Sequence, residues 1–199
     1  MAYNTVGGST SAAGNIVAFN HDLGIAKWED GVENYIANNS IHNNDNVGLR
    51  INVNTLVTDN NVYDNGVNRI EVPVDTLSIV NQHWGPQGRT DTYFVHYTCI
   101  TCELEIPSHT TLTLEPGARI RMDYNRTIKV AGTLNVLGTN ERPVTLTGPR
   151  DSIWAGDWNG ITFAPGSTGQ IQYADISFAK TGITNQGQVT VRDLSLIHI

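Results

Sequence analysis

Apolar and polar residues alternate over short stretches in the second half of the chain. Leu112/Leu114 and Leu134/Val136 are typical pairs, each with one polar residue between the two apolar ones. Alternation of this kind indicates a strand with one buried face. The first half has apolar runs of one to three residues between Asn-rich segments, which are too short for helices. Both halves therefore predict short β-strands.

Asparagine recurs at two fixed phases of the first half. Successive members of each column are 24 or 21 residues apart, the first column being Asn15, Asn39, Asn60 and Asn81, and the second Asn20, Asn44 and Asn65. A period of this length indicates a solenoid in which each repeat is one coil. Asn suits tight turns, and identical amides in coils stacked about 4.8 Å apart can form a hydrogen-bonded ladder. We therefore predict a structural ladder along both columns; a disordered Asn-rich tract would not preserve the register.

The second half repeats at a similar period. Ile106 to Ile128, Leu112 to Leu134 and Leu114 to Val136 are each 22 residues, and Ile120 to Val144 is 24. These spacings predict a second block of β-coils around an apolar core. A β-barrel or β-sandwich is the alternative, because closely spaced strands suit those folds too.

Changes in composition divide the chain into segments. Residues 1–81 are predicted to form Asn-rich coils, residues 82–98 a boundary rich in turn formers, and residues 99–193 the second block. An insertion near 149–157 interrupts the second block. Residues 194–199, LSLIHI, match the translation of a common sequencing adapter, so we interpret them as a read-through scar on a metagenomic fragment and leave them out of the fold prediction.

Composition narrows the classes of protein. Hydrophobic residues make up 39% and charged residues 16% of the 199, and the formal net charge is −7 without a basic run. Nucleic acid is therefore not an expected partner. No apolar run has the length of a membrane span.

The only two cysteines are Cys99 and Cys102, in a C-x-x-C arrangement. A structural disulfide and two inert thiols are both compatible with this spacing. A zinc site would need a second pair or suitably spaced histidines, for which only His96 and His109 are near.

Several segments resemble right-handed parallel β-helix repeat proteins, the superfamily that includes pectate lyases, and in particular its secreted and cell-surface bacterial members. The segments are NTVGGSTSAAGNI at 4–16, NSIHNN at 39–44, TLTLEPG at 111–117, VAGTLN at 130–135 and GDWNGI at 156–161. The resemblance implies an all-β, right-handed parallel β-helix with coils of about 20–25 residues. It also implies a secreted or cell-surface location. It is weak for activity, because a fold does not fix a function.

By the same resemblance, lyase-type members bind calcium through clustered carboxylates and use Arg or Lys to abstract a proton. The coil period collects no two carboxylates at one phase of this chain, so neither a calcium site nor a pair of hydrolytic acids is indicated. Calcium stays possible without a clear site, and we predict no catalytic residues and no cofactor. Arg50 and Glu71 share a phase and predict a surface ion pair.

Exposed aromatic rings are a common means of binding sugars. Trp154 and Trp158, in or beside the insertion, are the candidate carbohydrate-binding residues, although for Trp158 a place in the core beside the Gly156-Asp157 turn is the favoured alternative. The sequence favours a non-catalytic structural or adhesive segment that contacts polysaccharide or cell-surface glycan and adjoins further coils of the same protein. The alternative is a fragment of a polysaccharide lyase or glycoside hydrolase whose catalytic coils lie outside this chain.

Overall fold

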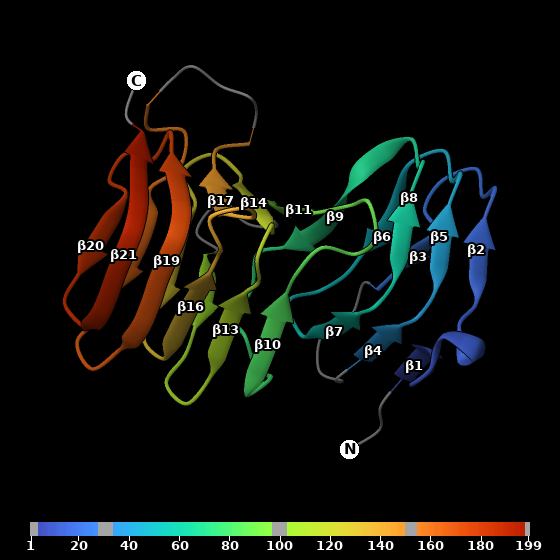
Figure 1. Ribbon diagram of the computed structural model, residues 1–199, viewed down its shortest axis with the longest axis horizontal. Coiled ribbons are helices and arrows are strands. Elements are labelled where there is room, and N and C mark those ends of the chain that lie inside the picture. The colour runs from blue at the N-terminus through green and yellow to red at the C-terminus, as the bar shows by residue number, and fades with distance from the viewer. Residues whose placement is uncertain (1–3, 28–33, 97–102, 150–154, 198–199) are drawn as a thin grey trace.

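The computed structural model describes residues 4–27, 34–96, 103–149 and 155–197. Within them nearly all regular structure is β-strand, and the only helix is the 3-10 turn η1 (Ser11–Ala13). The coils follow one another along the long axis of the molecule, with the N-terminal and C-terminal coils at opposite ends (Figure 1). All strand pairs are parallel. This holds in each of the four sheets that the described residues form. The predicted parallel β-helix is confirmed, and its form is compatible with the right-handed crossover that parallel strands favour.

The N-terminal block contains three coils of three strands each. The strands are β1 (Asn4–Gly7), β2 (Ile16–Ala18), β3 (Ile25–Ala26), β4 (Asn34–Ala37), β5 (Ser40–His42), β6 (Val47–Arg50), β7 (Thr55–Thr58), β8 (Asn61–Tyr63) and β9 (Val67–Pro73). Corresponding strands of successive coils pair, which gives the sheets β1-β4-β7 and β2-β5-β8 and the start of a sheet through β3, β6 and β9.

The C-terminal block continues the stack with longer strands. They are β10 (Asn81–Trp84), β11 (Thr92–His96), β12 (Leu104–Ile106), β13 (Thr111–Leu114), β14 (Arg119–Met122), β15 (Thr127–Val130), β16 (Thr133–Leu137), β17 (Val144–Thr147), β18 (Gly160–Phe163), β19 (Thr168–Ser177), β20 (Ile183–Asn185) and β21 (Gln188–Ile197).

The cross-section of the coil changes between the blocks. The sheet β2-β5-β8 ends in a single bridge from Val62 to Gly88, while a new sheet, β12-β15-β18-β20, begins beside the bridge from Thr76 to Glu105. The strands β10, β13 and β16 on one side and β11, β14 and β17 on the other converge on β19, which pairs with both β16 and β17. One strand thus spans two faces that are separate in the N-terminal block, and it bends at Tyr173, whose φ is 46°.

Some of the predicted spacings give the true register and others miss it by two residues. Leu112 pairs with Leu134 and Leu114 with Val136, as predicted. However, Ile106 pairs with Val130 rather than Ile128. Likewise, Ile120 pairs with Leu146 rather than Val144. A shift of two residues keeps the same side chains on the buried face, so the apolar pattern alone does not distinguish the two registers.

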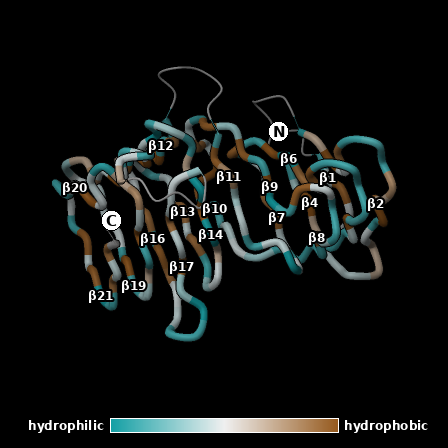
Figure 2. The backbone as a smooth tube through the Cα atoms, turned by 90° about the horizontal axis from the view of Figure 1, so that it is seen from above, coloured by the Kyte–Doolittle hydropathy of each residue, from teal (hydrophilic) through white to brown (hydrophobic). Residues whose placement is uncertain are grey.

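The core is one continuous apolar column. Ile41, Ile70, Tyr93, Leu134 and Ile176 are fully buried and belong to a single cluster that extends through both blocks. Hydrophobic positions recur from coil to coil along the tube (Figure 2). Each coil therefore buries its apolar side against its neighbours, as a solenoid requires.

The segment predicted as a boundary, residues 82–98, includes most of β10 and all of β11 and so contributes a coil of the stack. Trp84 is 1% exposed and its ring stacks on Tyr93, with 5.2 Å between the centroids. Residues 194–197, which the sequence interpretation left out, continue β21, and Leu194 pairs with Ala174 and packs against the core. The adapter interpretation of residues 194–199 stays a hypothesis, but its exclusion of 194–197 from the fold was wrong.

Candidate functional site

The first asparagine column forms a hydrogen-bonded ladder that ends at a different residue from the one predicted. Asn15 Nδ2 donates to Asn39 Oδ1 and Asn39 Nδ2 to Asn60 Oδ1, both at 3.0 Å. Asn60 Nδ2 then donates to Gln87 Oε1 at 3.1 Å. Asn81 was therefore the wrong fourth member. It is exposed in β10, where it pairs with Thr111.

The second column is also bonded along the axis. Asn20 Nδ2 donates to Asn44 Oδ1 at 2.7 Å, and Asn44 Nδ2 donates to Asn65 Oδ1 at 2.8 Å. Asn44 and Asn65 are buried, so these amides exchange water for one another in the interior. Their hydrogen bonds are needed because a buried unpaired amide is costly.

The left-handed turn conformation belongs to the residue before a ladder asparagine rather than to the asparagine itself. The residues concerned have φ between 49° and 60° and are Phe19, Asn38, Asn43, Asp59 and Asp64. Four of the five are Asn or Asp, the residues that tolerate this region best. The exception is Phe19.

The predicted sugar-binding tryptophan is not at the surface. Trp158 is fully buried, and its indole Nε1 donates to the carbonyl of Ser177 at 2.9 Å. Its assignment as a carbohydrate-binding residue was therefore wrong, and its core alternative holds. Trp154, Cys99 and Cys102 lie outside the described residues.

The predicted ion pair of Arg50 and Glu71 is more buried than a surface pair. Glu71 has a side chain 8% exposed and also accepts from Arg69, whose Nη2 is 2.8 Å from Oε1. Arg50 Nε donates to Oε2 at 2.6 Å. Burial by itself raises the pKa of Glu71, but the hydrogen bonds from Arg69 and Arg50 outweigh it and hold that pKa below its usual range.

Among the described residues, no three His, Cys, Asp or Glu side chains are grouped so that they could hold a metal ion. Acidic groups of the N-terminal block form separate pairs with single polar partners instead. Asn46 Nδ2 donates to Asp22 Oδ1 at 2.9 Å, and His21 Nδ1 lies 2.8 Å from Asp45 Oδ2.

An aromatic column crosses the outer face of β2-β5-β8. The ring of His42 stacks on Tyr63 with 4.8 Å between centroids and an interplanar angle of 20°. Phe19 lies edge-on to His42 at 6.0 Å, with an angle of 84°. The guanidinium of Arg89 lies 5.6 Å from the centre of the Tyr63 ring at the other end. We call these four residues the aromatic column.

Phe19 is the most unusual member of the aromatic column. It is 80% exposed, and its φ of 59° places a bulky residue in the left-handed region. The equivalent positions in the next two coils hold Asn43 and Asp64. A bulky residue there is strained by about 1–3 kcal/mol, and an exposed ring recovers little of that by burial. Strain at an exposed aromatic residue points to a role outside the fold.

A second row of side chains, one apolar and two polar, runs beside the aromatic column on the same face. Ile16, Ser40 and Asn61 are register partners on β2, β5 and β8, next to the register partners Ala18, His42 and Tyr63. Ile16 is 77% exposed and, like Phe19, offers apolar surface to the solvent. The face thus offers rings and a hydroxyl and an amide in neighbouring rows.

The sequence contained a signal for the aromatic column. His42 and Tyr63 occupy one phase of the same 21-residue alignment that reveals the asparagines, and Phe19 is one position later in its own coil. The sugar-binding prediction rested on tryptophans, and the two that the structure describes, Trp84 and Trp158, are buried.

A pocket with a volume of about 600 Å³ lies over β12, β15 and β18. Its lining is mostly aliphatic and includes the neighbouring charges Glu105 and Lys129, which are register partners. It has the size of a small-molecule site. The described residues that line it include no aromatic ring, so they do not provide the stacking surface of the aromatic column.

Comparisons with known proteins leave the interpretation to the structure itself. Neither the family models nor the curated proteins nor the solved structures gave a match to this chain. In the described part of the chain, no helix is long and apolar enough to cross a membrane.

Proposed function

We propose that this chain is a rigid, non-catalytic segment of a secreted or cell-surface protein, and that it adheres to glycan along the aromatic column. The observation that carries the proposal is Phe19, an exposed ring in a strained backbone position where the neighbouring coils have Asn43 and Asp64. A fold optimised only for stability would have Asn or Asp at that position too.

The chemistry of the face suits a sugar chain. Sugar rings have apolar faces that pack on aromatic rings and polar edges that need hydrogen bonds. Phe19 and Ile16 supply exposed apolar surface, while Ser40, Asn61 and Arg89 supply donors and acceptors beside it. Because the rows follow the axis, an extended chain lying along the stack meets several coils at once.

The stack provides the rigidity that an adhesive surface needs. The ladder amides of Asn39, Asn44 and Asn60 flank the strands β5 and β8 of this face and fix the corners of the coils that carry it. A pre-organised surface loses less conformational entropy on binding than a mobile one.

Binding to immobilised neutral polysaccharides tests the proposal. We expect retention on at least one of β-glucan, xylan and mannan, reduced about five- to tenfold by Tyr63→Ala, since an aromatic contact is worth about 1 kcal/mol. Tyr124→Ala is the matched control, because Tyr124 is 38% exposed and lies outside the aromatic column. Equal losses in the two variants, or no retention on any of the three, would refute the proposal.

Assays of turnover distinguish the adhesive proposal from the alternative, in which the chain is part of a polysaccharide lyase or hydrolase. We expect no unsaturated or reducing products from pectin, alginate or the neutral polysaccharides, with or without calcium. Product that disappears on chelation would restore the lyase interpretation.

A further inference from the structure

At the junction between the two blocks, β9 and β11 form a strand pair, but on the face of β7 and β10 the contact is made by side chains. β7 and β10 lie side by side but belong to different sheets. Gln82 Nε2 donates to the carbonyls of Val53 at 3.0 Å and Thr55 at 2.7 Å. Gln87 accepts from Asn60 across the same gap. Side-chain amides thus lie between β7 and β10 and take the place of a strand pair on this face.

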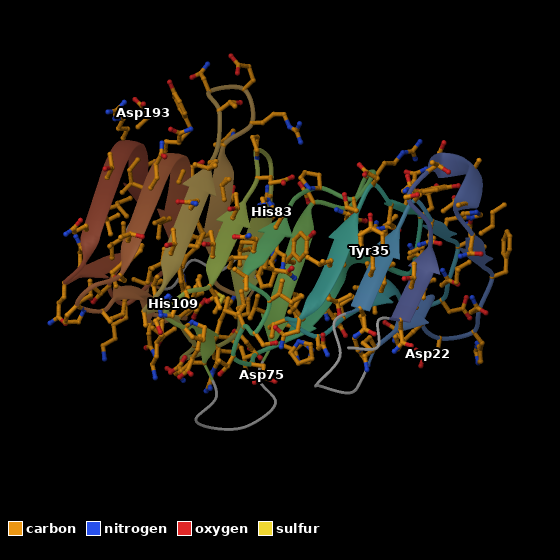
Figure 3. The ribbon with its side chains drawn as sticks, turned by 90° about the horizontal axis from the view of Figure 1, so that it is seen from below. Asp22, Tyr35, Asp75, His83, His109 and Asp193 are labelled. Carbon is orange, nitrogen blue, oxygen red and sulfur yellow. The ribbon has the colours of Figure 1, made fainter. Side chains whose placement is uncertain are left out.

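This separation leaves a pocket of about 260 Å³ on the outer surface, which we call the junction pocket. One wall comes from the N-terminal block and carries Tyr35, Leu56 and Asp59. The other wall comes from the C-terminal block and carries His83, Pro86 and Glu115. Figure 3 marks Tyr35 and His83, one from each block.

The junction pocket is acidic with aromatic walls. Asp59 and Glu115 contribute carboxylates from opposite sides, and none of the described residues that line the pocket is Lys or Arg. His83 Nδ1 lies 3.3 Å from Glu115 Oε1 and orients that carboxylate. Apolar and polar surface are both available to a ligand through Leu56, Pro86 and the two rings.

A glycine makes room for the carboxylate. A Cβ on Gly85 would come within 2.3 Å of Glu115 Oε2. The φ of Gly85 is not in the left-handed region, so alanine is compatible with its backbone. Gly85→Ala should therefore move the carboxylate without removing its charge or straining the chain.

We propose that the junction pocket binds a primary ammonium group carried on a small body, such as an amino sugar or an amine-bearing side chain. An ammonium between two carboxylates and beside the Tyr35 ring gains charge-assisted hydrogen bonds and a cation–π contact. A volume of about 260 Å³ accommodates one small body of this kind. A carboxylate or phosphate ligand would meet two like charges.

The site is distinct from the aromatic column, so it does not depend on the proposed function. The Phe19→Asn variant should keep amine binding while its glycan binding weakens. The two proposals can therefore fail separately.

The test is a set of titrations of the whole chain, followed by calorimetry or NMR, with four probes. Glucosamine and Nα-acetyl-lysine amide carry an ammonium group, while glucose and N-acetylglucosamine are uncharged counterparts. We expect binding of at least one amine, no binding of the uncharged probes, and weaker binding at high salt.

Variants assign the binding to the pocket. Glu115→Gln and Gly85→Ala should each weaken the amine about fivefold, the scale of one lost partly exposed charge contact. Glu141→Gln, which removes an exposed carboxylate away from the pocket, should leave binding unchanged. Circular dichroism and melting curves confirm that each variant is folded.

The outcomes separate the sources of the ammonium group. Binding of glucosamine alone assigns an amino sugar, binding of the lysine derivative alone assigns an amine-bearing side chain, and binding of both assigns the ammonium group itself. Binding of glucose as tightly as glucosamine, binding of neither amine, or an effect of Glu141→Gln equal to that of Glu115→Gln overturns the proposal.

Discussion

The two blocks of this β-helix turn the chain by different means. In the N-terminal block each coil turns at a left-handed residue followed by a ladder asparagine, as at Asp59-Asn60 and Asp64-Asn65. In the C-terminal block, β19 turns within a single strand at Tyr173, and the register of the stack comes from backbone pairing. In the first block, side-chain amides therefore add to the stability that backbone pairing provides in both blocks.

This difference also separates stability from recognition. In the N-terminal block, the turns at the ladder asparagines separate the sheet β2-β5-β8 from its neighbours, and the outer face of this sheet carries the aromatic column. The C-terminal block loses this face and gains the sheet β12-β15-β18-β20 on the other side. At the junction between the two arrangements β7 and β10 do not pair, and a pocket opens beside them.

The largest expected effect comes from breaking the ladder. The side chain of Asn60 donates hydrogen bonds to Gln87 and to the carbonyls of Ile36 and Thr58. It also accepts a hydrogen bond from Asn39. Asn60→Ala should lower the free energy of unfolding by about 3 kcal/mol, because several buried bonds are lost at about 1 kcal/mol each. Denaturant melts measure it. Asn140→Ala, an exposed asparagine of the C-terminal block, should cost less than about 0.5 kcal/mol.

The next effect concerns the buried carboxylate of the N-terminal block. Glu71→Gln should cost about 1–2 kcal/mol at neutral pH, because Arg50 and Arg69 lose their shared charge partner but stay partly solvated.

The pH dependence follows from the lowered pKa of Glu71. A carboxyl group with a lowered folded-state pKa stabilises fully above its unfolded-state pKa, and this contribution is lost as the pH falls through the folded-state pKa. The difference between wild type and Glu71→Gln should therefore shrink in acid. A difference that grows as the pH falls would contradict the assignment.

A smaller effect of opposite sign is expected at Phe19. Phe19→Asn should raise the free energy of unfolding by about 1 kcal/mol, since it relieves a strained backbone position and removes little buried area. Thermal melts of the two proteins decide this. A loss of stability would mean that the ring supports the fold.

The smallest expected effect tests which residue ends the first ladder, Asn81 as the alignment predicts or Gln87 as the structure has it. Asn81→Ala should change the free energy of unfolding by less than about 0.5 kcal/mol, because Asn81 is exposed and lies outside the ladder. Gln87→Ala should cost about 1–2 kcal/mol, through lost bonds to Asn60 and Gly85. The reverse order would restore Asn81 to the ladder.

These residues also show how far the sequence predicts the molecule. The period and phase of the asparagines predict the stacked coils because each amide bonds to its equivalent one coil away. Gln87 could not be found this way, since it lies 27 residues after Asn60, and its place depends on two strands that fail to pair. Trp158 is misleading because local sequence does not reveal which side of a turn is buried. The alignment places Phe19, His42 and Tyr63 close to one phase of the repeat and so could have predicted their stacking. The strain at Phe19, however, is visible only in the backbone angles.

The proposed adhesive role is tested most directly by one binding titration. The polysaccharide that the wild-type chain retains is titrated against wild type and Phe19→Asn under identical conditions. If the strained ring is kept for recognition, the variant should bind about five- to tenfold more weakly. Binding of the variant that equals the wild type would contradict the assignment of this face to glycan.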